Sequence, residues 1–247
     1  MTEAEWLACE DPDAMLRGLT QVARERKSLV SYRKLLLFGV ACYRKKIGDY
    51  ANPLPNSIAD ATDAFVDGQN DYSPIHRLWQ ETEKEVQKSR KNYSMLAEGW
   101  EELAYSFVGK LLSVSTPGIT REQKATRATK AIEQLIGEMR KHGGTGQTGV
   151  QRKQAERVGE RSLAKNLREL FGNPFRPITF ASAWRTSDVM LLARGIHDER
   201  AFDRMPILAD ALQDAGCDRD DILNHLRDPH ATHVRGCWAL DLVLSKE

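Results

Sequence analysis

Apolar residues recur at helical spacing along most of the chain, and no strand-like alternation of useful length appears. This pattern predicts an all-α fold in which several amphipathic helices pack as a multi-helix bundle. The stretch beginning at Ser73 is too long for one ordinary helix, so we expect a break or bend near Asn92. The main predicted helices span about residues 31–47, 73–114, 121–142, 150–171, 187–201, 205–215, 219–227 and 232–245.

Three helix starts are marked by capping signals. Thr2 with Glu5, and Thr120 with Gln123, each have the spacing of a capping box, in which two side chains satisfy free backbone N–H groups reciprocally. Asp11 followed by proline is typical of an N-cap with proline in the first turn. The exception to the helical pattern is residues 173–180 (NPFRPITF), whose two prolines predict a short irregular or extended segment.

The clearest break in the sequence is a glycine-rich segment, GGTGQTG, at residues 143–149. Such a composition is typical of a flexible linker. It predicts an N-terminal helical region over residues 1–142, which includes the long helices, and a C-terminal helical region over 150–247. Alternatively, the two regions pack together as one domain.

Composition indicates a globular protein with a substantial core. Of 247 residues, 41% are apolar and 29% are charged. No apolar run reaches the roughly 18 to 20 residues needed to span a membrane, and the acidic start does not resemble a secretory signal. The cysteines are scattered at 9, 42, 217 and 237 and do not form a dense disulfide framework. We therefore expect a reduced, cytoplasmic protein.

The net charge of +1 hides an uneven distribution. Residues 121–168 are strongly basic, and positions 153, 157, 161 and 165 form an i, i+4 ridge. Such a face could bind nucleic acid without sequence preference. Glu156 and Glu160 lie between these positions, and a solvated helix surface explains the pattern equally well.

The last thirty-one residues hold half of the cysteines and half of the histidines in the chain. Cys217, His225, His233 and Cys237 have side chains that ligate zinc, so they are the candidate metal ligands. His233 and Cys237 are four positions apart and would share one face of the predicted helix. Cys217 could join only by folding back from the helix axis. Alternatively, the cysteines are small buried hydrophobic residues and Cys237 packs beside Trp238.

No complete catalytic motif is present, because the chain lacks a phosphate-binding lysine loop, a zincin motif and a nucleophile elbow. The leading hypothesis is therefore a non-enzymatic helical interaction or regulatory protein with a protein partner. The alternatives are a zinc-binding protein or metalloenzyme that uses the cysteine and histidine cluster, and a nucleic-acid-binding protein. The expected core of the C-terminal helices consists of Trp184, Leu208, Leu212, Leu226, Trp238 and Leu242.

The two ends of the chain resemble one group of uncharacterised bacterial proteins with many paralogues. The resemblance rests on the TEAEWL start, on FGNPFRPITF and FDRMPILADALQDAGCD, and on the HVRGCW segment near the C-terminus. It is most specific over residues 171–247, and residues 69–165 correspond to a variable helical insert. The resemblance implies that the two ends form one structural unit. It supplies no catalytic residues.

Overall fold

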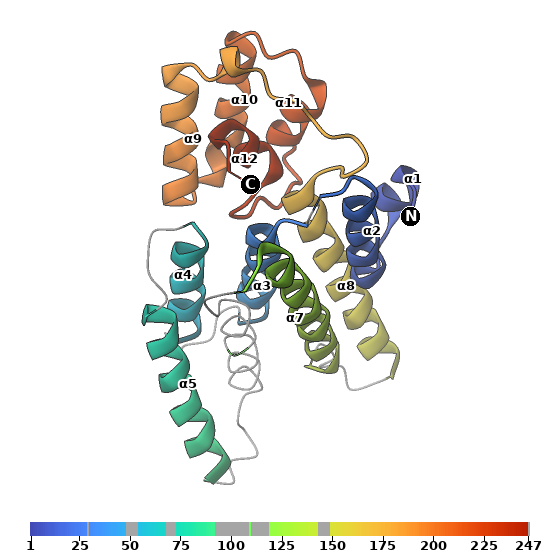
Figure 1. Cartoon of the computed structure of the whole chain (residues 1–247), viewed down its shortest axis with the longest axis vertical. Coiled ribbons are helices and arrows are strands. Elements are labelled where there is room, and N and C mark those ends of the chain that lie inside the picture. Colours follow the sequence, from blue (N-terminus) through green and yellow to red (C-terminus); the bar gives the residue numbers. More distant parts are fainter. Residues whose placement is uncertain are drawn as a thin grey trace. The chain divides into compact units, whose positions relative to one another are not determined.

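The fold is helical throughout the part of the chain that can be described (Figure 1). Within that part there are α-helices and short 3-10 helices but no strand, which confirms the predicted all-α class. The described helices include none with the length and apolar character required to cross a membrane. The computed structural model describes residues 1–28, 30–47, 54–67, 73–91, 109, 119–142 and 149–246.

The chain folds as two compact units. The terminal unit contains residues 1–8 and 165–247, and the middle unit contains residues 9–164. Residues 1–8 thus belong to the same unit as the C-terminal part of the chain. The predicted linker at 143–149 lies outside the described residues except for Gly149, at which α8 begins.

The middle unit is built from long helices that pack in pairs. Helix α3 packs against α4 and α7, α4 packs against α5, and α2 packs against α7. Fully buried Leu35, Phe38 and Tyr43 on α3 and Ile136 on α7 form part of its core. Of the stretch predicted over 73–114, residues Ser73–Lys91 form a helix, and the break predicted near Asn92 lies outside the described residues. The helices are α2 (Pro12–Glu25), α3 (Tyr32–Ile47), α4 (Leu54–Val66), α5 (Ser73–Lys91), α7 (Arg121–His142) and most of α8 (Gly149–Phe171).

The terminal unit packs short helices around a core to which several of the predicted residues contribute. Leu208, Leu212 and Leu226 are fully buried, and Trp184 and Trp238 pack against the core while remaining partly exposed. Leu242 is only half-buried and lies outside this core. The helices of the unit are α1 (Glu3–Ala8), the end of α8, α9 (Ser187–Glu199), α10 (Met205–Asp214), α11 (Asp220–Arg227) and α12 (Trp238–Leu244), with 3-10 turns at Ser182–Trp184 and Phe202–Arg204.

The predicted capping signals are confirmed. The Thr2 amide donates to Glu5 Oε2 at 2.8 Å, and the Glu5 amide donates to Thr2 Oγ1 at 3.3 Å. Thr120 and Gln123 form the same reciprocal pair at 2.9 and 3.2 Å. Asp11 caps α2 by accepting hydrogen bonds from backbone amides of its first turn. These helix starts are specified by residues within one turn of each other.

Helix α1 is fastened to the end of α8 within the terminal unit. The fully buried Trp6 donates from Nε1 to the carbonyl of Gly172 at 3.0 Å. In return, Arg168 donates from Nη1 to the Trp6 carbonyl at 3.3 Å, and Asn173 donates to Glu3 Oε1 at 2.8 Å. The predicted non-helical segment at 173–180 follows directly and is confirmed.

The prediction of a helix over 232–245 is wrong in its first half. Helix α12 begins only at Trp238, and residues 228–237 form turns and irregular backbone. Gly236 has φ of 90°, a left-handed conformation that interrupts a helix. His233 and Cys237 therefore do not lie on one helical face. The two side chains instead meet through the folding of the 228–237 segment against α8 and α11.

Candidate metal centre

Four potential metal ligands converge in the terminal unit. They are Glu169 near the end of α8, His225 in the last turn of α11, His233 in the 228–237 segment, and Cys237 at the N-cap of α12. One ligand atom from each residue lies within 4.8 Å of all the others. The four side chains thus meet at one point, although they come from two helices, an irregular segment and the start of a third helix.

The carboxylate of Glu169 is the hub of this cluster. Its Oε1 lies 2.9 Å from His233 Nδ1, and its Oε2 lies 3.4 Å from His225 Nε2. His225 Nε2 also lies 3.3 Å from the sulfur of Cys237. The two imidazole rings meet edge to face, with their centroids 5.1 Å apart. Each side chain therefore contacts at least one other member of the cluster.

Glu169 is a buried acid that remains ionised. Only 6% of its side chain is exposed. Burial raises the pKa of this carboxyl, but hydrogen bonds and charge interactions with His225 and His233 outweigh burial and lower the pKa to about 2. The charge of a buried carboxylate requires such partners. Glu169 is thus held in the acceptor form that a metal ion requires.

Cys237 provides the only sulfur of the cluster and is fully buried. Burial raises the pKa of its thiol well above the ordinary value, and the neighbouring Glu169 carboxylate raises it further. Without a cation, this residue is therefore a neutral thiol. A bound metal would supply the positive charge that favours a thiolate here.

Two of the ligand-atom distances suit a tetrahedral metal ion, whereas the four atoms as a set lie within 4.8 Å of one another and would have to draw closer around the ion. Zinc bonds of about 2.0 Å to nitrogen or oxygen and 2.3 Å to sulfur place neighbouring ligand atoms roughly 3.3 to 3.8 Å apart. The distances from His225 Nε2 to Cys237 and to Glu169, 3.3 and 3.4 Å, fall within this range. The 2.9 Å contact between His233 and Glu169 is a hydrogen-bond distance and would lengthen slightly.

The same residues do not form a nucleophilic triad. In a triad, one imidazole nitrogen faces the nucleophile and the other nitrogen is oriented by the acid. Here Cys237 and Glu169 both contact Nε2 of His225. The buried thiol also has a raised pKa, whereas a nucleophilic cysteine needs a lowered one. The arrangement favours metal ligation over covalent catalysis.

The structure brings together three of the four residues that the sequence predicted as ligands. His225, His233 and Cys237 belong to the cluster, whereas Cys217 is 3% exposed and packs in the hydrophobic core. Burial raises the pKa of the Cys217 thiol. The position expected for Cys217 is taken by Glu169, which sequence analysis missed. No local sequence pattern marks Glu169, which lies on α8 between buried Asn166 and Leu170.

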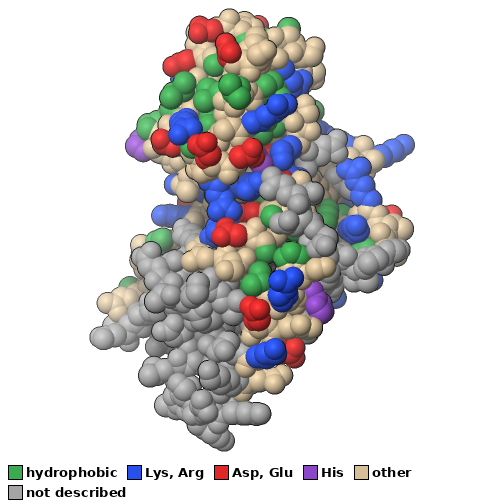
Figure 2. All heavy atoms as spheres, turned by 90° about the vertical axis from the view of Figure 1, so that its left-hand side faces the viewer, with side chains coloured by type: hydrophobic (Ala, Val, Ile, Leu, Met, Phe, Trp, Pro, Cys, Tyr) green, Lys and Arg blue, Asp and Glu red, His purple; other side chains and the backbone are tan. Residues whose placement is uncertain are grey.

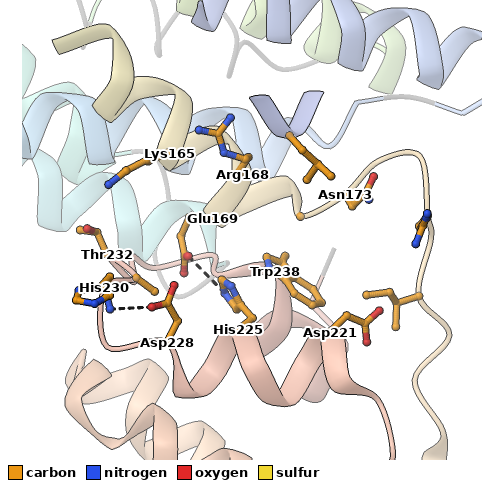
Figure 3. Close-up of a pocket in the computed structure, with 15 residues that line it drawn as sticks. Lys165, Arg168, Glu169, Asn173, Asp221, His225, Asp228, His230, Thr232 and Trp238 are labelled. Atoms are coloured by element: carbon orange, nitrogen blue, oxygen red, sulfur yellow. Dashed lines mark hydrogen bonds and ion pairs between the residues drawn. The ribbon is translucent and has the colours of Figure 1, made fainter. Parts of the chain in front are cut away.

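An open pocket of about 500 Å³ adjoins the cluster (Figure 3). Glu169 and His225 line it, and Figure 3 shows the indole of Trp238 beside His225. The centroids of those two rings are 4.9 Å apart. The cluster is therefore reached from solvent on the side of Glu169 and His225, since His233 and Cys237 are not among the lining residues.

The basic ridge predicted on α8 is exposed where it belongs to the middle unit. Lys153, Arg157 and Arg161 are solvent-accessible. Arg161 forms an ion pair with Glu10 at 2.8 Å, and Arg140 binds Glu160 at 3.0 Å. These carboxylates neutralise part of the basic surface, so nucleic-acid binding over residues 121–168 stays a prediction.

Comparisons with known proteins do not add to this description. No family model matches the chain, and searches of curated proteins and of solved structures find no match. The resemblance of the chain ends to a bacterial family therefore stays a prediction.

Proposed function

We propose that this chain is a non-enzymatic, helical regulatory protein whose terminal unit is held together by a zinc ion. The observation that carries the proposal is the convergence of Glu169, His225, His233 and Cys237 within 4.8 Å. The ligand set is close to the one expected from the sequence, with Glu169 in place of Cys217. The interaction role and the zinc role are thereby combined in one protein.

Zinc is the metal that this donor set fits best. One sulfur, two imidazoles and one carboxylate form a mixed set that suits zinc, whereas magnesium and calcium prefer oxygen ligands alone. The four donors match a tetrahedral coordination number. A bound zinc ion would stabilise the Cys237 thiolate and replace the direct contacts between Glu169 and the two histidines.

The site supports a structural role rather than catalysis. Four protein ligands complete a tetrahedral shell, whereas catalytic zinc ions keep one position for water or substrate. The ligands also join α8, α11 and the irregular 228–237 segment to the start of α12. The role of the metal would thus be to fix the segment that lacks regular backbone hydrogen bonding.

Two further features support the remaining parts of the proposal. All cysteines are free thiols, which suits a reduced, cytoplasmic location. Leu191 on α9 and Ile207 on α10 are 74% and 56% exposed. Single exposed apolar residues are ordinary, whereas contiguous exposed apolar patches mark sites of protein–protein interaction. Figure 2 shows hydrophobic side chains gathered between charged ones on the part of the terminal unit that faces the viewer.

The decisive experiment is a metal titration of untagged protein after dialysis against a chelator. We expect one equivalent of zinc to bind, with release of a proton from the thiol. Cobalt added in place of zinc should give a thiolate-to-cobalt charge-transfer band. The Cys237→Ala variant should lose that band and bind zinc at least about a hundredfold more weakly, because one ligand of four is removed.

Cys217 provides the matched control. It is a buried cysteine of the same unit but lies outside the cluster. The Cys217→Ala variant should keep both the cobalt spectrum and the zinc stoichiometry. Binding of less than about 0.1 equivalents to folded wild-type protein would refute the zinc proposal. Equal losses in the two variants would refute the ligand assignment.

A further inference from the structure

The pocket beside the cluster has an uneven distribution of charge. Lys165, Arg168 and Glu169 lie on neighbouring positions of α8, and all of them line the pocket. Figure 3 shows Lys165 and Arg168 extending from the same stretch of α8 as Glu169. Lys165 is four positions before Glu169 and three before Arg168, so it shares a helical face with each of them, whereas Arg168 and Glu169 are adjacent in the sequence and do not face each other.

The cations of the pocket differ in how they are held. Arg168 is anchored by its hydrogen bond to the Trp6 carbonyl, and Arg176 forms an ion pair with Glu3 at 2.7 Å. Lys165 is exposed and has no ion pair or hydrogen bond with any other described residue. Its ammonium group is therefore available to an incoming anion, while Arg168 adds a positive charge three positions away.

The other acids that line the pocket, Asp221 and Asp228, have partners of their own. Asp221 forms an ion pair with Arg219 at 2.6 Å, and Asp228 accepts a hydrogen bond from the His230 amide at 2.8 Å. Asp228 keeps its negative charge, because the His230 amide is neutral. Glu169 is the acid that shares a helical face with Lys165 and would oppose an anion there. A zinc ion bound to Glu169 would remove that opposition, because the metal neutralises its ligand.

Part of the remaining wall of the pocket is apolar, beside polar residues such as Asn173 and Thr232. Trp238 and Ile178 line it, and neither is fully buried. A volume of about 500 Å³ lies within the range of small-molecule sites. An indole face suits an aromatic or alkyl group of a ligand. The lining therefore contains a cationic side formed by Lys165 and Arg168 and an apolar part at Trp238 and Ile178, together with polar and acidic residues.

We propose that the zinc-loaded terminal unit binds a small organic anion, with its carboxylate or phosphate at Lys165 on the cationic side and its apolar part against Trp238. This inference rests on the proposed zinc site, because zinc is what neutralises Glu169. Binding of the anion and of zinc is therefore coupled, and each tightens the other by the same factor. In this proposal, the small organic anion is the ligand to which the regulatory protein responds.

The test is calorimetric titration of zinc-loaded and zinc-free protein with benzoate, phenyl phosphate and neutral benzyl alcohol. We expect both anions to bind the zinc-loaded protein at least about fivefold more tightly than the zinc-free protein. Benzyl alcohol should bind more weakly than either anion. The ratio of benzoate to phenyl phosphate affinity then distinguishes a carboxylate ligand from a phosphate ligand.

Variants connect this binding to the pocket. Lys165→Gln should weaken both anions at least about fivefold without changing the zinc stoichiometry, because the lysine forms no hydrogen bond or ion pair with a metal ligand. The matched control is Lys153→Gln, an exposed lysine of the same helix outside the pocket. Trp238→Phe should weaken benzoate and phenyl phosphate, which both carry a phenyl ring, and leave inorganic phosphate, titrated as a ring-free control, unaffected. Circular dichroism verifies that each variant is folded.

The outcomes separate the two proposals. If zinc binds with one equivalent and neither anion binds, the anion site is refuted while the zinc site stands. If no zinc binds, the zinc site fails and the coupled anion site fails with it. Anion binding that is equal in wild type and Lys165→Gln would also overturn the assignment, since it would arise elsewhere on the protein.

Discussion

The indole nitrogen of Trp6 donates a hydrogen bond to the carbonyl of Gly172, 166 positions away in the sequence, at 3.0 Å. Gly172 in turn packs against Trp238: a Cβ built on this glycine would lie 3.0 Å from Trp238 Cγ. Trp238 lies beside His225 of the metal cluster, with the two rings tilted. The start of the chain is thereby linked to the site through a short series of contacts.

Replacing Trp6 by phenylalanine should destabilise the terminal unit by roughly 1 to 3 kcal/mol, because the substitution removes the donor to Gly172 and leaves space around a smaller ring. Urea denaturation of the zinc-free protein measures the change. Leu191→Ala, an exposed site of the same unit, should change stability by less than about 0.5 kcal/mol. Equal effects of the two substitutions would contradict a specific role for the indole.

Gly172→Ala should destabilise the terminal unit by about 1 to 3 kcal/mol. The residue has φ of 60°, and the new methyl group would meet the Trp238 ring. We also expect weaker zinc binding, since a displaced Trp238 would disturb His225. The control is Gly195→Ala on α9, where a Cβ would have nothing within 4 Å.

The control substitution, Gly195→Ala, should change the stability in the opposite direction. Alanine favours a helix over glycine, so Gly195→Ala should leave stability unchanged or raise it by up to about 1 kcal/mol. Thermal and urea unfolding of both variants provide the comparison. A stabilising effect at Gly172 would show that its conformation and its contact with Trp238 are less important than the geometry implies.

The acid stability of the zinc-free protein should depend on Glu169. Its pKa falls from 4.5 to about 2 on folding, so ionised Glu169 contributes stability that is fully present above pH 4.5 and is lost as pH falls toward 2. The full contribution is roughly 3 kcal/mol. Free energies of unfolding at several pH values should fall less steeply for Glu169→Gln. If the unfolding free energies of wild type and Glu169→Gln change in parallel with pH, Glu169 is not the group responsible for the acid sensitivity.

Thiol accessibility gives an independent check on the packing. Cys9 is half-exposed, whereas Cys42, Cys217 and Cys237 are buried. A thiol reagent should therefore modify one cysteine quickly in the native, zinc-free protein and all of them after denaturation. Cys9→Ser should remove the fast phase. A second fast thiol that zinc protects would indicate that Cys237 is more open than the structure has it.

The features that could be predicted from the sequence are those that depend on residues close together in the chain. The capping pairs at Thr2 and Thr120 act within one turn, so their spacing alone identifies them. Glu169 could not be found in this way, because its partners His225 and His233 are brought to it by the folding of the whole terminal unit. The irregular backbone before Cys237 was missed because apolar residues on both sides of Gly236 imitate helical spacing.

Glu169 and Cys237 stand near the two ends of the segment that makes up most of the terminal unit. A metal ion bound to both would close a loop of roughly 70 residues and restrict the unfolded chain accordingly. A peptide that contains only residues 217–247 holds three of the ligands but lacks the fourth. Metal retention would therefore report whether the entire terminal unit has folded, because the four ligands meet only in the folded unit.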